Sequence, residues 1–103
     1  MVIAIISFSK YYMQFKFTKN IQFTKLIKAN GRLKEFNFRK KNDHKEGFFT
    51  VDVVDERDNR IFFSVQKIEN NWKLVKQPLL PVWVVENENI YHDVIEEELK
   101  SAN

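Results

Sequence analysis

The stretch IQFTKLIKANGRLKEFNF, residues 21–38, contains a pair of residues that favours a tight reversal of the chain. Asn30 and Gly31 both tolerate positive φ, the geometry that the two central positions of a type I′ turn require. The pair therefore predicts a hairpin that joins a strand at 21–29 to a strand at 32–40.

A two-residue turn also fixes which residues of the hairpin face each other. If Ala29 lies opposite Arg32, then Phe23 lies opposite Phe38. Because side chains alternate between the two sides of a strand, this register gathers the large apolar residues on one side. The residues on that side are Ile21, Phe23, Ile27, Phe36 and Phe38. A ribbon with one apolar side must be covered, so we expect the later chain to cover it.

The composition is that of a small aromatic core. With 103 residues the chain predicts a single domain, 1–103. Ten Phe, three Tyr and two Trp supply large rings that fill a small core efficiently. Because cysteine is absent, disulfides, a thiol nucleophile and a thiolate zinc site are excluded. A cytoplasmic location is the default expectation.

Residues 1–12 include the apolar run VIAII at 2–6. This run is too short to span a bilayer and lacks the basic flank and cleavage pattern of a signal peptide. An added strand is one expectation for 1–12. Since the segment beginning at Met13 alternates well, the other is that 1–12 form an upstream extension of a chain that starts there.

Charge is distributed unevenly, although the formal net charge is only +3. From Lys10 to Lys45 there are eleven Lys or Arg against two acids, a net charge of +9. From Glu86 to Lys100 there are six acids against one Lys, a net charge of −5. A basic half can attract nucleic acid, anionic lipid or an acidic partner. The alternative is that these charges are the hydrated side of strands whose other side is core.

The strands on either side of the hairpin follow from alternation and turn signals. Residues 13–19 predict a short strand or extended arm, and the polar segment 41–47 predicts a loop before a strand at 48–54. The charged run 55–59 predicts a turn, followed by a strand at 60–68. Asn70-Asn71 then predicts a two-residue loop that sets Val65 opposite Lys76 and Lys67 opposite Leu74, and that leads into a fifth strand at 72–76.

The chain changes character at its two prolines. Pro78 and Pro81 forbid central pairing, so 77–81 must leave the sheet and cross one end of it. Residues 82–85, VWVV, favour a strand by composition, but Pro81 also suits the first turn of a short helix. A helix follows, with Asn87 or Asn89 as its N-cap. Its apolar stripe consists of Ile90, Tyr91, Val94, Ile95 and Leu99.

The predicted fold class is therefore α+β. We expect an antiparallel meander of five or six strands with one C-terminal helix packed on one face. The helix-covered side should carry the core phenylalanines, which are Phe23, Phe36, Phe38, Phe49 and Phe63.

No set of residues forms a recognisable catalytic or metal site. The only histidines are His44 and His92, and both are expected to face solvent. Adjacent helical residues point about 100° apart, so His92 and Asp93 do not form a dyad. The acids at 55–58 lack the central glycine and the distal Glu of a calcium loop, and a hairpin turn explains them better. We expect a protein that is not an enzyme and has no catalytic residues, cofactor or metal.

The side of the sheet opposite the helix is expected to be too apolar to be simply hydrated. Its apolar residues are Leu26, Leu33, Phe48, Phe62, Ile68 and Val75. The N-terminal segment, a second subunit or a ligand would cover them. We expect a binding or interaction domain that self-associates or binds a protein partner, with no membrane partner. The residues predicted for the partner surface are Leu26, Lys28, Arg32, Arg39, Lys41, Phe48 and Phe62.

A single-stranded nucleic-acid-binding module is the alternative function, since single strands are held by stacking bases on exposed aromatic residues within a basic groove. Phe48 or Phe62 would stack on bases. The residues that would contact phosphates are Lys25, Lys28, Arg32, Lys34, Arg39 and Lys41. The segment FTKLIKANGR, 23–32, is similar to the opening strands of PUR-type single-strand-binding repeats, whose layout is a curved meander followed by one helix. The later strands and the crossing at 78–85 depart from that pattern.

A small-molecule carrier is a third class of function. A meander that curls can enclose a ligand between its sheet and its helix. The sequence offers no convergent polar group for such a pocket.

Overall fold

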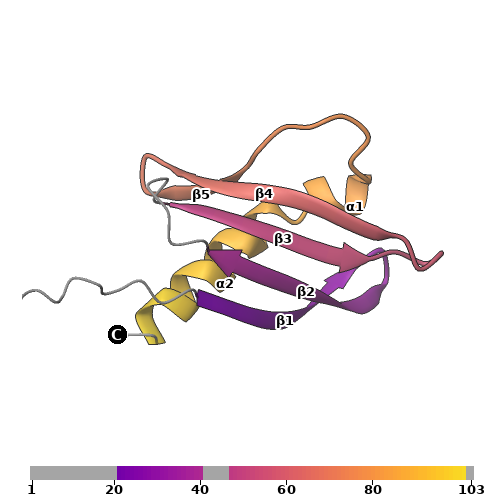
Figure 1. Ribbon diagram of the computed structural model, residues 1–103, viewed down its shortest axis with the longest axis horizontal. Coiled ribbons are helices and arrows are strands. Elements are labelled where there is room, and N and C mark those ends of the chain that lie inside the picture. The colour runs from indigo at the N-terminus through magenta and orange to yellow at the C-terminus, as the bar shows by residue number, and fades with distance from the viewer. Residues whose placement is uncertain (1–20, 41–46, 102–103) are drawn as a thin grey trace, which may run out of the picture.

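The computed structural model describes residues 21–40 and 47–101. The predictions for 1–20 and for 41–46, including His44 and Lys41, lie outside the described residues. The fold is α+β, with five antiparallel strands in one sheet in chain order and a C-terminal helix (Figure 1). The strands are β1 (Ile21–Ala29), β2 (Arg32–Lys40), β3 (Phe48–Val54), β4 (Arg60–Ile68) and β5 (Asn71–Leu74), and the helices are α1 (Val82–Val85) and α2 (Glu88–Ser101).

The first hairpin has the predicted register. Ala29 pairs with Arg32, and Phe23 pairs with Phe38. Asn30 and Gly31 have φ of 55° and 77°, the left-handed values that a type I′ turn needs. The rings of Phe23 and Phe38 are nearly parallel, with centroids 4.8 Å apart, so the turn brings two large apolar groups into direct contact.

The register predicted for β4 and β5 is wrong by two residues. Val65 pairs with Leu74, not with Lys76, and Lys67 pairs with Trp72, not with Leu74. The turn lies at Glu69-Asn70, whose φ values are 51° and 71°. The observed pairing sets one apolar residue opposite another, a favourable cross-strand contact that the predicted register does not make.

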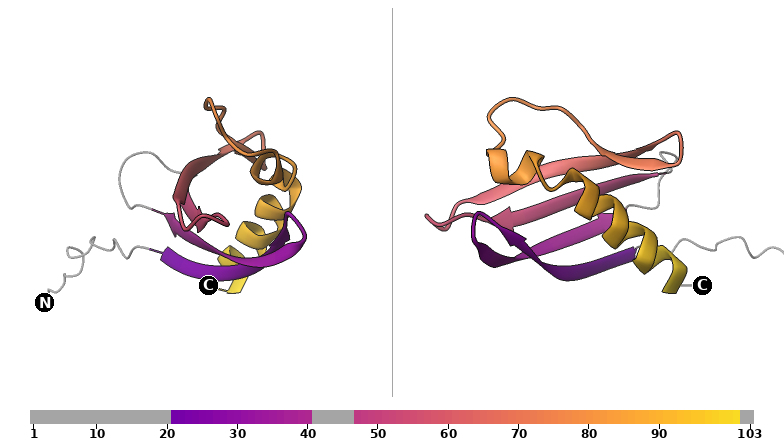
Figure 2. Two further views of the ribbon diagram at one scale, coloured as in Figure 1. Left: turned by 90° about the vertical axis from the view of Figure 1, so that its right-hand side faces the viewer. Right: turned by 180° about the vertical axis from the view of Figure 1, so that it is seen from behind.

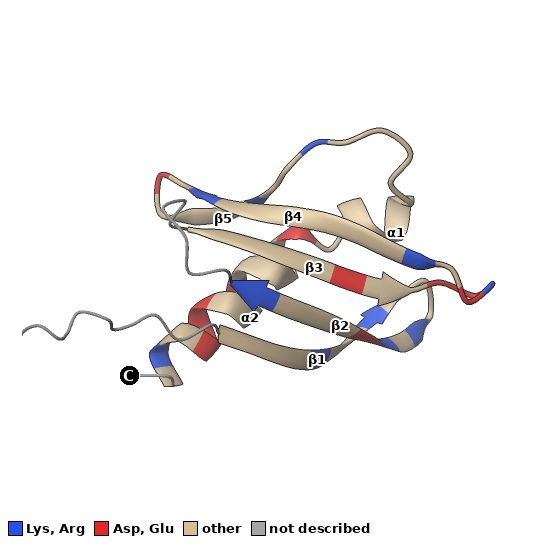
Figure 3. Ribbon diagram, in the orientation of Figure 1, with Lys and Arg blue, Asp and Glu red and all other residues tan. Residues whose placement is uncertain are grey.

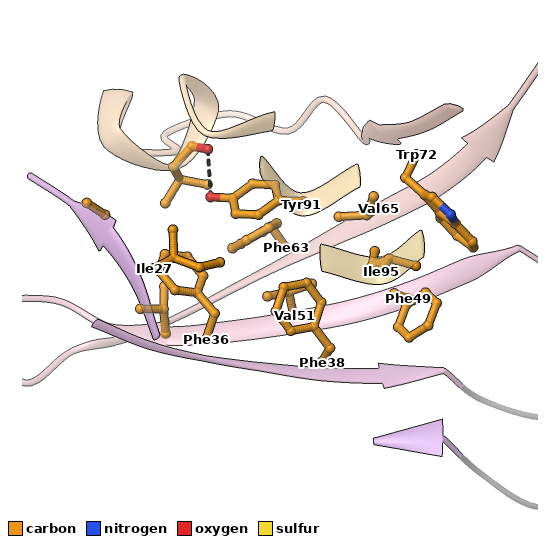
Figure 4. Close-up of a cluster of buried hydrophobic side chains, with 13 residues drawn as sticks. Ile27, Phe36, Phe38, Phe49, Val51, Phe63, Val65, Trp72, Tyr91 and Ile95 are labelled. Atoms are coloured by element: carbon orange, nitrogen blue, oxygen red, sulfur yellow. Dashed lines mark hydrogen bonds between the residues drawn. The ribbon is translucent and has the colours of Figure 1, made fainter. Parts of the chain in front are cut away.

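The core lies between the sheet and α2, and aromatic rings dominate it (Figure 4). Tyr91 of α2 is fully buried, and its ring centroid is 5.7 Å from that of Phe36 and 5.2 Å from that of Phe63. The hydroxyl of Tyr91 donates a 2.8 Å hydrogen bond to the carbonyl oxygen of Val84, which ties α2 to α1. Of the predicted core phenylalanines, Phe23 is half-buried and the other four are buried.

The ambiguous segment 82–85 is one turn of helix, not a sixth strand. Pro81 immediately precedes α1 in an extended conformation, and its carbonyl oxygen accepts hydrogen bonds from the main-chain N–H groups of Val84 and Val85. The following helix begins at Glu88, directly after Asn87. In its predicted stripe, Tyr91 and Ile95 are buried, Val94 and Leu99 are half-buried, and Ile90 is 39% exposed.

The sheet curls around α2, which lies in the hollow of the curve and beside β5 (Figure 2). The side chains of α2 also satisfy main-chain groups of β5. The main-chain N–H of Trp72 donates a 3.0 Å hydrogen bond to Nδ1 of His92. The main-chain N–H of Leu74 donates a 2.7 Å hydrogen bond to the carboxylate of Glu88. The expectation that His92 faces solvent is therefore wrong, because this half-buried side chain is held by an edge strand that needs hydrogen-bond acceptors.

Candidate interaction surface

The outer face is the side of the sheet that points away from α2. In each strand it carries the residues that alternate with the core residues, as the paired register requires. Four of its residues form one row across the sheet, because Thr24 pairs with Asn37, Asn37 with Asp52, and Asp52 with Phe62. Blue and red segments show where charged residues occur along β2, β3 and β4 (Figure 3).

Asp52 is the centre of the outer face. Its residue is only 2% exposed, although it lies on the side of the sheet away from the apolar core. One carboxylate oxygen accepts hydrogen bonds from Asn37 at 2.9 Å and from Arg60 at 2.5 Å, and the other accepts one from Arg39 at 2.8 Å. We call Arg39, Asp52 and Arg60 the Arg–Asp–Arg cluster.

The electrostatics of the cluster favour an ionised Asp52. Burial raises the pKa of the Asp52 carboxyl, but hydrogen bonds from Asn37, Arg39 and Arg60 act in the opposite direction and prevail. The net pKa is below the ordinary value for aspartate. The carboxylate therefore serves as a fixed negative anchor for two positively charged side chains.

Arg39 and Arg60 are anchored but remain partly exposed, and Phe62 is exposed on the same face. The side chains of Arg39 and Arg60 remain 49% and 50% exposed while each holds Asp52. Phe62 is 55% exposed and lies directly opposite Asp52 on the neighbouring strand. The outer face thus presents an aromatic ring on the same side of the sheet as two half-exposed guanidinium groups that Asp52 holds in place.

A hydrogen-bonded row extends the cluster toward the edge of the sheet. Thr24 donates its hydroxyl to the amide oxygen of Asn37 at 2.6 Å, and Asn37 donates its amide N–H to Asp52. Asn37 therefore has its carbonyl and one donor occupied, which orients the amide. Polar contacts thus connect β1 to β4 across the middle of the outer face.

Five of the seven residues predicted for the partner surface share the outer face. They are Leu26, Lys28, Arg39, Phe48 and Phe62. Leu26 is 62% exposed, whereas Phe48 is half-buried. Arg32 is exposed at the hairpin turn, and its register with Ala29 assigns it to the opposite side. Lys41 lies outside the described residues.

Two of the lysines predicted to contact phosphates are on the helix side and are held by acids. Lys25 lies 4.0 Å from Glu98 of α2. Lys34 donates a 2.7 Å hydrogen bond to Glu56, and its ammonium lies 5.0 Å from the ring centroid of Trp83. Hydrogen bonds from Lys34 and Asn30 lower the pKa of Glu56 to about 2. The six predicted phosphate contacts therefore do not share one face.

The charged run 55–59 forms the turn between β3 and β4, as predicted. Asp55 accepts hydrogen bonds from the main-chain N–H groups of Arg57 and Asn59, at 2.8 and 2.9 Å. Asp58 takes a positive φ of 65° in the same turn. These contacts close the reversal, while Glu56 ties the turn to the tip of the first hairpin.

Two clefts flank the Arg–Asp–Arg cluster. The smaller, about 150 Å³, is lined by Thr24, Asn37 and Arg39 among others. The larger, about 370 Å³, includes Asn37 and Arg60 in its lining and lies where β2 and β3 separate. The pairing of these strands runs only from Lys40 with Phe49 to Asn37 with Asp52, so the first half of β2 diverges from β3 and opens this cleft.

Sequence reasoning missed Asp52 and Arg60 as site residues. The available signal was an acid in the middle of the apolar strand FFTVDVV, 48–54, which requires a partner when it lies in a sheet. A second unpredicted surface lies on the crossing before α2. Leu79 is fully exposed with a φ of 66°, and Val82 is 73% exposed.

Within the described residues, no helix combines the length and the apolar character needed to cross a bilayer. Fold and surface together define a small α+β domain with a curved sheet and an ordered, charged outer face. Comparison of the chain with models of known families, with curated proteins and with solved structures found no match. The likeness to PUR-type repeats accordingly stays a prediction.

Proposed function

We propose that this protein is a non-enzymatic interaction domain whose outer face binds a protein partner or a second copy of the chain. The observation that carries the proposal is the exposure of Phe62 on the same face as Arg39 and Arg60, both of which are held by a buried carboxylate. Aromatic residues and arginine are the residue types that dominate binding energy at protein interfaces.

The fixed geometry of the surface supports binding for an energetic reason. A free arginine side chain loses rotamer freedom when a partner immobilises it. Here Asp52 has already restricted Arg39 and Arg60 through short hydrogen bonds. Less conformational entropy is then lost on association, so a given set of contacts gives a tighter complex. A cytoplasmic location belongs to the same proposal.

A photo-crosslinking experiment tests the proposal. A benzophenone amino acid replaces Phe62 in one version of the protein and the exposed Glu97 of α2 in a matched control. After irradiation in an extract of the natural source and at high concentration of the pure protein, we expect protein adducts from position 62 and far fewer from position 97. Equal yields at the two positions would contradict the proposal. Sedimentation velocity over a range of concentrations then separates self-association from a different partner.

Single-stranded nucleic-acid binding is the second candidate. The supporting observation is that Phe62, the exposed ring required for stacking, lies on the same face as Lys28 and Arg39. Binding driven by phosphates weakens steeply with salt, with a log-log slope of about 0.7 per neutralised phosphate for single strands. A labelled oligonucleotide that shows no salt-sensitive binding at low ionic strength would eliminate this candidate.

A further inference from the structure

We propose that the Arg–Asp–Arg cluster binds a carboxylate of an acidic segment in a partner protein, while Phe62 packs against an apolar side chain of the same segment. This inference rests on the proposed function and adds the chemistry of the partner. It joins three observations on the outer face: two anchored arginines, a buried carboxylate and an exposed ring.

The arginines have donors left for a ligand. A guanidinium carries five N–H donors in a planar fork. Each fork donates through Nη1 to a different oxygen of Asp52, and about half of each side chain remains exposed. Because both forks converge on one carboxylate, they are close neighbours. A second carboxylate above the cluster can accept from the exposed donors of both.

The charge of the cluster matches one anionic group. Two arginines and one ionised Asp52 give a local net charge of +1, which a single carboxylate balances. Arginine forks hold carboxylates through paired, charge-assisted hydrogen bonds that are stronger than neutral ones. Asp52 holds both guanidinium groups in place through these contacts.

The charge near the cluster favours the side of Arg39 for an acidic partner. The register places Arg39 and Arg60 on the outer face, whereas the acids of α2, red in Figure 3, lie on the helix-covered side of the sheet. The larger cleft beside Arg60 also contains Glu35, Asp55, Glu56 and Asp58, so the acidic segment is expected to approach from the cleft lined by Thr24, Asn37 and Arg39. An acidic segment is attracted to the two arginines and repelled by the acids of that larger cleft and of α2. This complementarity sets the orientation of the partner before close contacts form.

The same observations favour a peptide over a single-stranded nucleic acid. A strand of nucleic acid requires a row of cations and several stacking rings. Lys25 and Lys34 are held on the helix side by Glu98 and Glu56. One ring beside one carboxylate-sized site matches a peptide in which an acid and an apolar residue are neighbours.

Fluorescence anisotropy with three labelled probes tests the inference. The probes are a peptide of alternating Glu and Val, the same peptide with Lys in place of Glu, and an oligothymidine of similar length. We expect the intact protein to bind the acidic peptide most tightly. Arg39→Gln and Arg60→Gln should each weaken this binding about tenfold, as expected for loss of charge-assisted hydrogen bonds.

A matched control separates the cluster from general attraction. Arg57 is exposed in the β3–β4 turn, so Arg57→Gln removes the same charge without touching Asp52, and we expect a change in affinity of no more than about twofold. Phe62→Ala should weaken binding severalfold while the protein stays folded, since more than half of the residue is exposed. If an arginine variant fails to fold, Phe62→Ala and the charge-conserving Arg60→Lys replace it, and both should weaken binding.

The outcomes distinguish this inference from the proposed function. Tighter binding of oligothymidine or of the lysine peptide overturns the inference, as does equal weakening by Arg57→Gln. If the acidic peptide does not bind while position 62 still crosslinks to protein, the acidic partner is wrong and the interaction domain stands. If neither binding nor crosslinking occurs, both proposals fail.

Discussion

Nδ1 of His92 accepts a 3.0 Å hydrogen bond from the main-chain N–H of Trp72. Helix α2 thus provides the hydrogen-bond acceptor that a neighbouring strand would otherwise provide at this edge of the sheet. Leu74 repeats the arrangement, because its main-chain N–H donates to Glu88 at 2.7 Å. A side-chain contact is added where the indole N–H of Trp72 donates to Glu96 at 2.8 Å. Edge strands with free N–H groups promote aggregation, and α2 protects β5 against it.

The first prediction follows from this contact. His92→Ala removes the acceptor of the Trp72 amide, which should exchange its hydrogen faster, and it should lower the free energy of unfolding by about 1 kcal/mol. Amide hydrogen exchange followed by NMR measures the first effect. Asp93→Ala, at the exposed neighbouring position, is the control and should leave the Trp72 amide unchanged. Equal exchange in wild type and His92→Ala would mean that the hydrogen bond does not protect this edge.

The second prediction concerns Asp52 and acid. The hydrogen bonds from Asn37, Arg39 and Arg60 hold the pKa of Asp52 below its unfolded value. The ionised carboxylate therefore stabilises the fold above about pH 4, and this contribution is lost as pH falls through the lower folded pKa. Asp52→Asn should cost about 1 to 3 kcal/mol at neutral pH, near the lower end because both arginines are half-exposed.

Urea unfolding at a series of pH values measures this effect. The difference between wild type and Asp52→Asn should shrink as pH falls below about 4 toward the lower pKa of the folded protein, because protonation of Asp52 then favours the unfolded chain. Asp93→Asn supplies the same chemical change at an exposed position of α2. A constant difference between wild type and Asp52→Asn down to the lowest pH would show that the charge of Asp52 is not what stabilises the cluster.

The third prediction concerns the hydroxyl of Tyr91. Burial raises the pKa of Tyr91, so the fold favours the neutral phenol, and stability is lost as pH rises through the unfolded pKa of about 10. Tyr91→Phe keeps the ring but removes the hydrogen bond to Val84 and should cost about 1 kcal/mol at neutral pH. Thermal unfolding between neutral and alkaline pH measures both effects. A wild type that loses no more stability at high pH than Tyr91→Phe does would contradict the prediction.

The fourth prediction compares the two glycines. Gly31 and Gly47 have φ of 77° and 73°, so alanine is strained at both positions by about 1 to 2 kcal/mol. A Cβ at Gly31 meets nothing within 4 Å, whereas one at Gly47 lies 3.1 Å from Cβ of Lys67. Gly47→Ala should therefore destabilise the protein more than Gly31→Ala. Chemical denaturation of the two variants measures the order, and the reverse order would show that the contact with Lys67 relaxes freely.

Local chemistry made the first hairpin predictable. Asn30 and Gly31 form the turn with their own backbone preferences, and a two-residue turn leaves a single register for the strands beside it. The helical stripe was predictable for a similar reason, because Tyr91 and Ile95 are four residues apart and share one helix face. Both features depend on residues that are close in the sequence.

The register of β4 and β5 was not predictable in this way. A slip of two residues leaves every side chain on the same face, so the apolar pattern does not distinguish the two registers. The pairing of Val65 with Leu74 and the position of the Lys67 ammonium, 5.7 Å from the Trp72 ring centroid, accompany the register that forms. In the same register, the main-chain N–H groups of Trp72 and Leu74 donate to His92 and Glu88 of α2.

The sequence alone determined the α+β architecture, the first reversal and the sorting of the phenylalanines, because these follow from alternation, turn preference and helical spacing. Only the tertiary structure brought Arg39, Asp52 and Arg60 together, since they belong to three different strands. Seven residues separate the end of β2 from the start of β3, so no two-residue turn fixes the register between these strands. The Arg–Asp–Arg cluster therefore leaves no recognisable pattern among residues that are close in the sequence. Its stability depends on side-chain contacts shorter than 3 Å, which only the folded sheet creates.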